Sequence, residues 1–220
     1  MGAPSSISNP FLFLELGVLP IKYEIHKRQI SFLHHIVNLC EDDPVRMLYE
    51  NMKRLPFEKN WLNDVLASAS EYSIDVDEER LQSISKDTFK SKVRSAIETH
   101  AFQKLKIECS AQTKTKYLQY KVFQRQSYLV QLYPNQAKVI LQCRAKCLKI
   151  KDHRPFQFKN NICRWCNLEE ETVNHIVNCG CDEEMTPVCI NDIDKIDQLL
   201  ECKLTTFATR INHFLDMVDY

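Results

Sequence analysis

The sequence has little glycine, no long apolar run and no net charge. Only 3 glycines occur in 220 residues, which disfavours a glycine-rich phosphate-binding loop and a β architecture with many tight turns. No stretch approaches the roughly 20 consecutive apolar residues of a membrane-spanning helix. The apolar segment 11–21 contains Glu15 and has no basic flank before it, so it does not resemble a signal peptide. We therefore expect neither a membrane partner nor secretion.

Cysteine, in contrast, is abundant, with 10 residues. A disulfide scaffold would require an oxidising compartment, and the sequence shows no convincing signal for secretion. Cys109, Cys143 and Cys147 occupy positions that we expect to be helical, where a reduced cysteine behaves as a small buried apolar residue. The cysteine content therefore favours a reducing compartment, the nucleus or the cytoplasm.

The apolar residues recur with a period near 3.6, which predicts a mainly α-helical protein built as an irregular helical bundle. The clearest helices begin at Ile21, after Pro20, and at Pro44, after two aspartates. A long helix is expected to open at Ser85–Asp87. Other helices are expected over 61–70, 117–133, 135–150 and 193–218. We divide the chain into a disordered start (1–10), a helical domain (11–110), a basic helical segment (111–160), a zinc knuckle (161–181), and an acidic linker with a C-terminal helix (182–220).

The zinc knuckle is predicted from four residues with the spacing of metal ligands. They are Cys163, Cys166, His175 and Cys179. Two thiolates two residues apart can hold one tetrahedral ion from a tight turn. His175 and Cys179 would share one face of a short helix capped by Thr172. Four protein ligands leave no open position, so we expect one structural Zn²⁺ rather than a catalytic one.

An alternative fourth ligand is Cys181, because the run Cys179–Cys181 could shift the ligand by two residues. A catalytic zinc site is not supported. A nucleobase deaminase needs His-x-Glu with Pro-Cys-x-x-Cys, and a metalloprotease needs His-Glu-x-x-His. Neither pattern occurs in the sequence.

The zero net charge conceals two segments of opposite sign. Residues 113–160 contain eleven lysines and arginines and one acid, whereas residues 165–202 contain ten acids and one lysine. Such asymmetry points to charged partners. Basic side chains that lead into a zinc knuckle, with aromatic residues between them, are typical of nucleic-acid binding, because cations neutralise phosphates and rings stack on bases. The candidate nucleic-acid-binding residues are Lys138, Arg144, Lys146, Lys149, Lys151, Arg154, Lys159 and Trp165, with Phe156 and Phe158 nearby.

Several short motifs, in order, resemble the region that follows the polymerase core in reverse transcriptases of non-LTR retrotransposons. Residues 15–21 (Glu-Leu-Gly-Val-Leu-Pro-Ile) and 25–35 match its E-L-G-x-L-P segment and its K-R-R-x-x-(Y/F)-L-H helix, with Gln29 in place of an arginine. Later matches are Trp61, Ser85-Lys86-Asp87-x-Phe89-Lys90, Ala101-Phe102, Tyr128-Leu129, Arg144-x-Lys146-x-Leu148, Glu171-Thr172-x-x-His175 and the four knuckle residues. The resemblance covers nearly all of residues 11–180, although the knuckle spacing of eight and three residues departs from the family's commoner seven and four.

This resemblance implies a C-terminal region that holds RNA or DNA, without the catalytic core. No Tyr/Phe-x-Asp-Asp motif occurs, and the stretch 180–220 after Cys179 is too short for an endonuclease domain. We therefore expect a nucleic-acid-binding zinc-knuckle module that is not an enzyme, resembles a truncated retroelement product and takes no small-molecule substrate. The alternative is a protein-interaction module in which the acidic segment covers the basic one. The sequence leaves this choice open.

Overall fold

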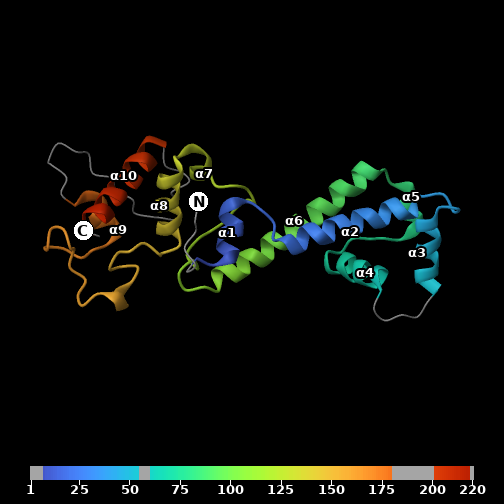
Figure 1. Cartoon of the computed structure of the whole chain (residues 1–220), viewed down its shortest axis with the longest axis horizontal. Helices are drawn as coiled ribbons and strands as arrows, with labels where there is room; N and C mark the ends of the chain where they lie inside the picture. Colours follow the sequence, from blue (N-terminus) through green and yellow to red (C-terminus); the bar gives the residue numbers. More distant parts are fainter. Residues whose placement is uncertain (1–6, 55–59, 180–200, 219–220) are drawn as a thin grey trace. The chain divides into compact units, whose positions relative to one another are not determined.

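The computed structural model describes residues 7–54, 60–179 and 201–218 and shows a mainly helical protein (Figure 1). This confirms the predicted fold class. None of the described helices is long and apolar enough to cross a membrane. The chain forms two compact units, here called the helical unit (Leu19–Lys104) and the metal-site unit (Met1–Val18 with Leu105–Tyr220).

The described residues of the helical unit form four helices and most of a fifth. They are α2 (Ile21–Val37), α3 (Pro44–Arg54), α4 (Trp61–Glu71), α5 (Glu78–Ser83) and α6 (Lys86–Ser110), whose last residues belong to the other unit. The predicted starts at Ile21 and Pro44 and near Ser85 are confirmed. Helix α5 was not expected, because its first turn lies in a stretch that resembles an acidic linker; the Asp77 side chain caps it by accepting from the Arg80 N–H.

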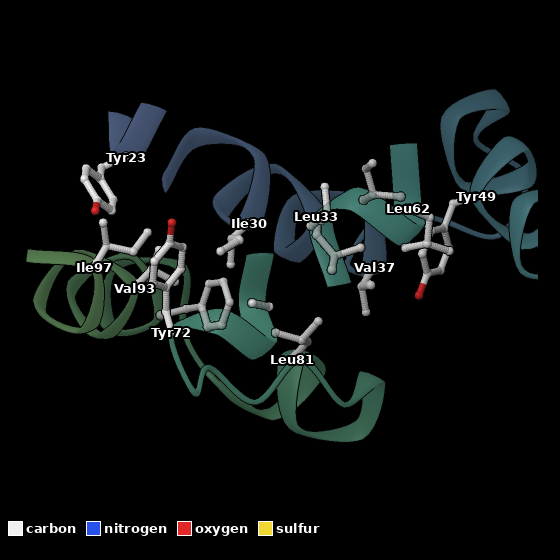
Figure 2. Packing of buried hydrophobic residues seen from close by; sticks show 14 of the residues in the cluster. Tyr23, Ile30, Leu33, Val37, Tyr49, Leu62, Tyr72, Leu81, Val93 and Ile97 are labelled. Atoms are coloured by element: carbon white, nitrogen blue, oxygen red, sulfur yellow. The ribbon is translucent and has the colours of Figure 1, made fainter. Parts of the chain in front are cut away.

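The core of the helical unit is one cluster of buried residues to which α2, α3, α4, α5 and α6 all contribute (Figure 2). Ile30 on α2 and Val93 and Ile97 on α6 are fully buried, as the helical periodicity predicts. The His34 ring stacks on Phe89, with 4.8 Å between ring centroids, and the Tyr23 ring lies 6.4 Å from that of His100. The end of α2 therefore lies near the start of α6 and the start of α2 near the later part of α6, so the two helices run antiparallel.

The metal-site unit combines one helix from the start of the chain with the helices that follow α6. They are α1 (Asn9–Leu16), α7 (Tyr128–Gln131), α8 (Pro134–Arg144), the 3-10 turn η1 (Pro155–Gln157), α9 (Val173–Asn178) and α10 (Glu201–Val218). Helix α10 packs on α8 and α9 through buried residues that include Phe207 and Phe214. Over 201–218 it agrees with the predicted C-terminal helix, whereas 193–200 lie outside the described part of the chain.

Segment 11–18 belongs to the metal-site unit and not, as the sequence-based division has it, to one domain with 19–110. Helix α1 begins within the predicted disordered start and buries Phe11 and Leu14. The Glu15 carboxylate is fully buried and accepts hydrogen bonds from Tyr120 and Tyr128 (both 2.5 Å) and from Arg144 (3.0 Å). These partners are far from Glu15 in the sequence, so no local pattern could show the contacts.

Two predicted helices are shorter in the structure. Segment 117–127 is irregular because its side chains serve tertiary contacts: Tyr117 donates to the Arg144 carbonyl and Tyr120 donates to Glu15. Helix α8 ends at Arg144 rather than near Ile150. Lys146 adopts a left-handed φ of 47°, and the Lys146 and Cys147 N–H groups donate to the carbonyls of Cys143 and Gln142. This pair of bonds is the Schellman pattern that closes a helix.

Candidate metal centre

The four predicted ligands lie together in the metal-site unit. The ligand atoms of Cys163, Cys166, His175 and Cys179 all lie within 4.8 Å of one another. The Cys163 and Cys179 sulfurs are 3.8 Å apart, and the Cys166 sulfur lies 3.3 Å from His175 Nε2. In a tetrahedral zinc site with Zn–S bonds of about 2.3 Å, two sulfurs are separated by about 3.8 Å. The four side chains can therefore hold one metal ion.

The turn that carries Cys163 and Cys166 directs backbone N–H groups at both sulfurs. The Trp165 N–H donates to Cys163 and the Leu168 N–H to Cys166, each at 3.4 Å. The turn needs a left-handed residue, and Asn167 supplies it with a φ of 56°, a conformation that asparagine tolerates better than most residues. Such N–H groups stabilise a thiolate, which is the form that binds metal.

Helix α9 positions His175. The Thr172 side chain caps it by accepting from the His175 N–H at 3.1 Å, as predicted. Cys179 does not continue the helix: its φ of −70° and ψ of 130° make it the extended residue that ends α9. The expectation that His175 and Cys179 share one helical face is therefore wrong in detail. The thiol reaches the site because the chain turns away from the helix axis at this residue.

The second ring nitrogen of His175 has a carboxylate partner. His175 Nδ1 lies 3.0 Å from a Glu169 oxygen, so the arrangement favours the tautomer that donates from Nδ1 and leaves Nε2 as the ligand atom. Metal-binding histidines are commonly oriented by a carboxylate in this way. In the sequence Glu169 is one acid of a charged run, and its place shortly before His175 was the signal for this role.

The neighbouring thiols differ in acidity. The backbone N–H groups of Glu169 and Leu168 lower the pKa of Cys166 to about 6, whereas burial and the adjacent cysteines raise the pKa of Cys179 to about 12. Negative charge is thus stabilised at one sulfur and opposed at another close by. A divalent cation among the sulfurs removes that opposition.

The buried carboxylate of Glu171 holds the knuckle to the preceding chain. It accepts from the Lys151 N–H (3.1 Å), from the Arg164 N–H (3.0 Å) and from the Arg164 guanidinium (2.8 Å). The Lys151 ammonium donates to Asn160 (2.8 Å) and to the Ile162 carbonyl. Glu171 and Arg164 were not among the predicted site residues, because their roles depend on a pairing that only the folded loop produces.

The predicted nucleic-acid-binding residues differ in exposure. Arg144, fully buried in its ion pair with Glu15, and Lys151, buried against the knuckle, do not present their charges on the surface. Arg154 is half-buried and donates to the Cys147 carbonyl at 3.0 Å. The remaining lysines are exposed, and they are Lys138, Lys146, Lys149 and Lys159.

The aromatic residues also separate by role. Trp165 is half-buried and packs against α10, with its ring 5.5 Å from that of His213 and 6.1 Å from that of Phe214. Phe156, in contrast, is 99% exposed. It lies between the exposed Lys149 and Lys159 in the loop that leads to the metal ligands, so it, rather than Trp165, offers an exposed ring on this part of the surface.

Two parts of the sequence-based site lie outside the described residues. They are Cys181, the alternative ligand, and residues 182–200 of the acidic segment. Comparisons of the chain with protein-family models, with curated proteins and with solved structures found no match.

Proposed function

We propose that the chain is a nucleic-acid-binding module organised by one structural zinc ion. The observation that carries the proposal is a fully exposed phenylalanine, Phe156, among exposed lysines in the loop that enters the Cys₃His site. An isolated ring in water is unfavourable, and an aromatic side chain beside cations suits a stacked base with its phosphates. The resemblance of residues 11–180 to the post-polymerase region of retrotransposon reverse transcriptases supports the same function.

Zinc is the metal that best suits the ligand set. Three thiolates and one imidazole in a tetrahedral arrangement are typical of structural zinc sites. All four ligands come from the protein, so the ion would have no open position for a substrate. Its role would be to hold the loop of Phe156 and Lys159 to α9 and α10.

The first test is zinc content. Purified protein should carry about one zinc per chain, and Cys163→Ser/Cys166→Ser should carry none, because both thiolates of the knuckle are lost. Cys40→Ser, at an exposed cysteine outside the site, is the matched control. Full zinc retention by the double variant would refute the assignment.

The second test is the salt dependence of binding to a single-stranded RNA or DNA of about ten nucleotides. Each phosphate that the protein neutralises contributes about −0.7 to the slope of log affinity against log salt. If four or five of the basic residues that are not fully buried engage the strand, the slope should be roughly −3. These residues are Lys138, Lys146, Lys149, Arg154 and Lys159.

Phe156→Ala should weaken that binding by about 1–3 kcal/mol if a base stacks on the ring, with zinc content unchanged. Leu168→Ala is the control, since Leu168 is also largely exposed, at 82%, within the metal site but has no aromatic ring. Trp165→Ala should instead loosen the packing of the knuckle on α10. Equal binding by the wild type and Phe156→Ala would remove the stacking role.

In the protein-interaction alternative, the acidic segment covers the basic one. It is tested by neutralising acidic side chains. Deletion of 182–220 is not suitable, because it would also remove the buried side chains of α10. The variant Asp182→Asn/Glu183→Gln/Glu184→Gln should bind nucleic acid as well as the wild type or better. If neither protein binds RNA, single-stranded DNA or duplex at low salt, the nucleic-acid proposal fails.

A further inference from the structure

The helical unit contains a basic pocket that the function proposed above does not use. It is an open pocket with a volume of about 530 Å³ between α2 and α6. Its size is within the range of about 300–1,000 Å³ typical of sites for small ligands. The lining residues are Lys27, Arg28, Ser31, Phe32, His35, Lys86, Lys90 and Arg94.

The lining follows from the two helices. On α6, Lys86, Lys90 and Arg94 are spaced by four residues and therefore form one stripe. On α2, Lys27, Ser31 and His35 are spaced by four residues, and so are Arg28 and Phe32. These two adjacent rows share one face of the helix. Because α2 and α6 run antiparallel, the two stripes face the same space along about two helical turns.

The positive charge of the pocket is only partly compensated. Lys27 pairs with Glu24 at 2.7 Å and Arg94 with Glu98 at 2.8 Å. Within the described part of the chain, the remaining cations of the lining form no ion pair, and no acidic residue contributes to the lining. These cations are Arg28, Lys86 and Lys90. Like charges gathered in a hollow repel one another and raise the local concentration of anions.

The pocket also has an aromatic wall. Phe32 is 46% exposed, and its ring is held edge-on by Trp61, with a centroid distance of 5.8 Å and an interplanar angle of 71°. The His35 ring lies 6.1 Å from it, and Ser31 adds a hydroxyl. A ring fixed at its edge leaves a face for a planar group, and base–aromatic stacking is favourable for any base.

We propose that this pocket binds a nucleotide, with its phosphates on Lys86, Lys90 and Arg28 and its base on Phe32. Phosphate alone would explain the cations but not the fixed aromatic ring beside them. The ligand is either a free nucleoside triphosphate or one nucleotide of a single strand, since both present the same phosphates and base. This site lies in the helical unit and is independent of the zinc-dependent surface proposed above.

The experiment uses full-length zinc-loaded protein carrying Phe156→Ala/Lys159→Gln, so that the surface near the metal site is weakened. Two probes are titrated separately, ATP and a ten-nucleotide single strand, while amide NMR shifts of residues 21–37 and 86–98 are followed. Shifts with ATP identify a free nucleotide as the ligand, and shifts with the strand alone identify a nucleotide unit of a chain. Absence of shifts with both probes overturns the proposal, whatever the outcome at the metal-site unit.

Variants locate the binding. Lys86→Gln/Lys90→Gln should raise the Kd at least tenfold, and Phe32→Leu should raise it about 5- to 150-fold if the base stacks on the ring. Lys92→Gln is the matched control, because Lys92 is an exposed lysine of the same helix that does not line the pocket. Equal affinities of the double variant and Lys92→Gln would overturn the proposal. If the double variant loses helicity, the single variant Lys90→Gln, at an exposed position, replaces it. Its Kd is then compared with that of Lys92→Gln, and equal values overturn the proposal.

Discussion

Glu15 is a charged residue enclosed entirely by the protein. Its two carboxylate oxygens accept from two tyrosine hydroxyls and one guanidinium, so the charge is balanced and hydrogen-bonded. Burial and the adjacent carboxylate raise the pKa of Tyr120 and Tyr128, which keeps both hydroxyls protonated as donors. The cluster connects α1 to α8 and to the irregular segment between α6 and α7.

Glu15→Gln should destabilise the metal-site unit by about 3–5 kcal/mol, because it leaves Arg144 buried without its counter-charge. The measurement is urea unfolding followed by circular dichroism. Asp75→Asn removes the partner of Arg80 in a pair whose side chains are 50% and 74% exposed, and it should cost no more than about 1 kcal/mol. Similar losses in the two variants would show that the Glu15 pair is not a special contributor to stability.

His153 is a second buried polar residue, and it makes stability depend on pH. Burial, with Lys146, Lys114 and Arg154 nearby, lowers its pKa to about 4. The Leu148 N–H donates to its Nδ1 at 3.3 Å, whereas its Nε2 is buried without a hydrogen-bond partner. The folded protein therefore holds this imidazole neutral.

Because the pKa of His153 is lower in the folded chain than in the unfolded one, the unfolded state takes up the proton first as the pH falls. Stability should decrease between about pH 6.5 and pH 4, by about 3 kcal/mol from this residue. His153→Asn keeps an acceptor for the Leu148 N–H but cannot titrate. The unfolding free energy of this variant should therefore fall less than that of the wild type over the same pH range. The difference between the two proteins isolates His153 from the candidate metal ligands, which are the same in both. Parallel pH profiles would contradict this prediction.

At the scale of elements, the end of α1 depends on one glycine. Gly17 caps α1 with a φ of 60°, a region that other residues rarely adopt. A Cβ at this position would lie 2.3 Å from the Arg125 nitrogen and 2.4 Å from the Gln124 carbonyl carbon. Both are backbone atoms, so the chain itself would have to move.

Gly17→Ala should therefore destabilise the metal-site unit by more than the roughly 1–2 kcal/mol of the left-handed conformation alone. Thermal unfolding and proteolysis near residue 17 measure the effect. Ser73→Ala is the comparison, because Ser73 has a φ of 55° and already carries a Cβ. If Gly17→Ala were as stable as the wild type, the backbone of 124–125 could move away from the added methyl group at little cost, and the prediction would be wrong.

At the scale of the whole molecule, the chain is two compact units, and the four candidate metal ligands lie in one of them. Metal binding to a site absent from the unfolded chain contributes directly to folding. Removal of the proposed zinc ion should consequently affect only the metal-site unit.

A strong zinc chelator should increase hydrogen exchange in 147–179 and 204–218, where the knuckle and α10 pack on each other, and should leave α2 and the first turns of α6 protected. Hydrogen exchange with mass spectrometry resolves these segments. Excess zinc should restore the protection. A uniform rise across both units would mean that they unfold as one cooperative body.

The sequence by itself determined the helical class, the helix starts at Ile21 and Pro44, and the four residues that could hold a metal ion. Each depends on local rules: apolar period, capping chemistry and the ligand spacing within the short segment 163–179. These signals act between residues close in the chain, so they can be recognised without knowing the fold.

Only the tertiary structure decided which charges and rings are available. Arg144 and Lys138 look alike in the sequence, yet Arg144 is buried because Glu15, 129 positions earlier in the chain, is its partner. Trp165, which was expected to present its ring, is half-buried because α10 packs against it, whereas Phe156 is exposed. The basic pocket exists because α2 and α6, which are separated in the sequence by three other helices, align two stripes of cations. Burial and charge pairing are properties of distant contacts, and for that reason the spacing of residues along the chain does not contain them.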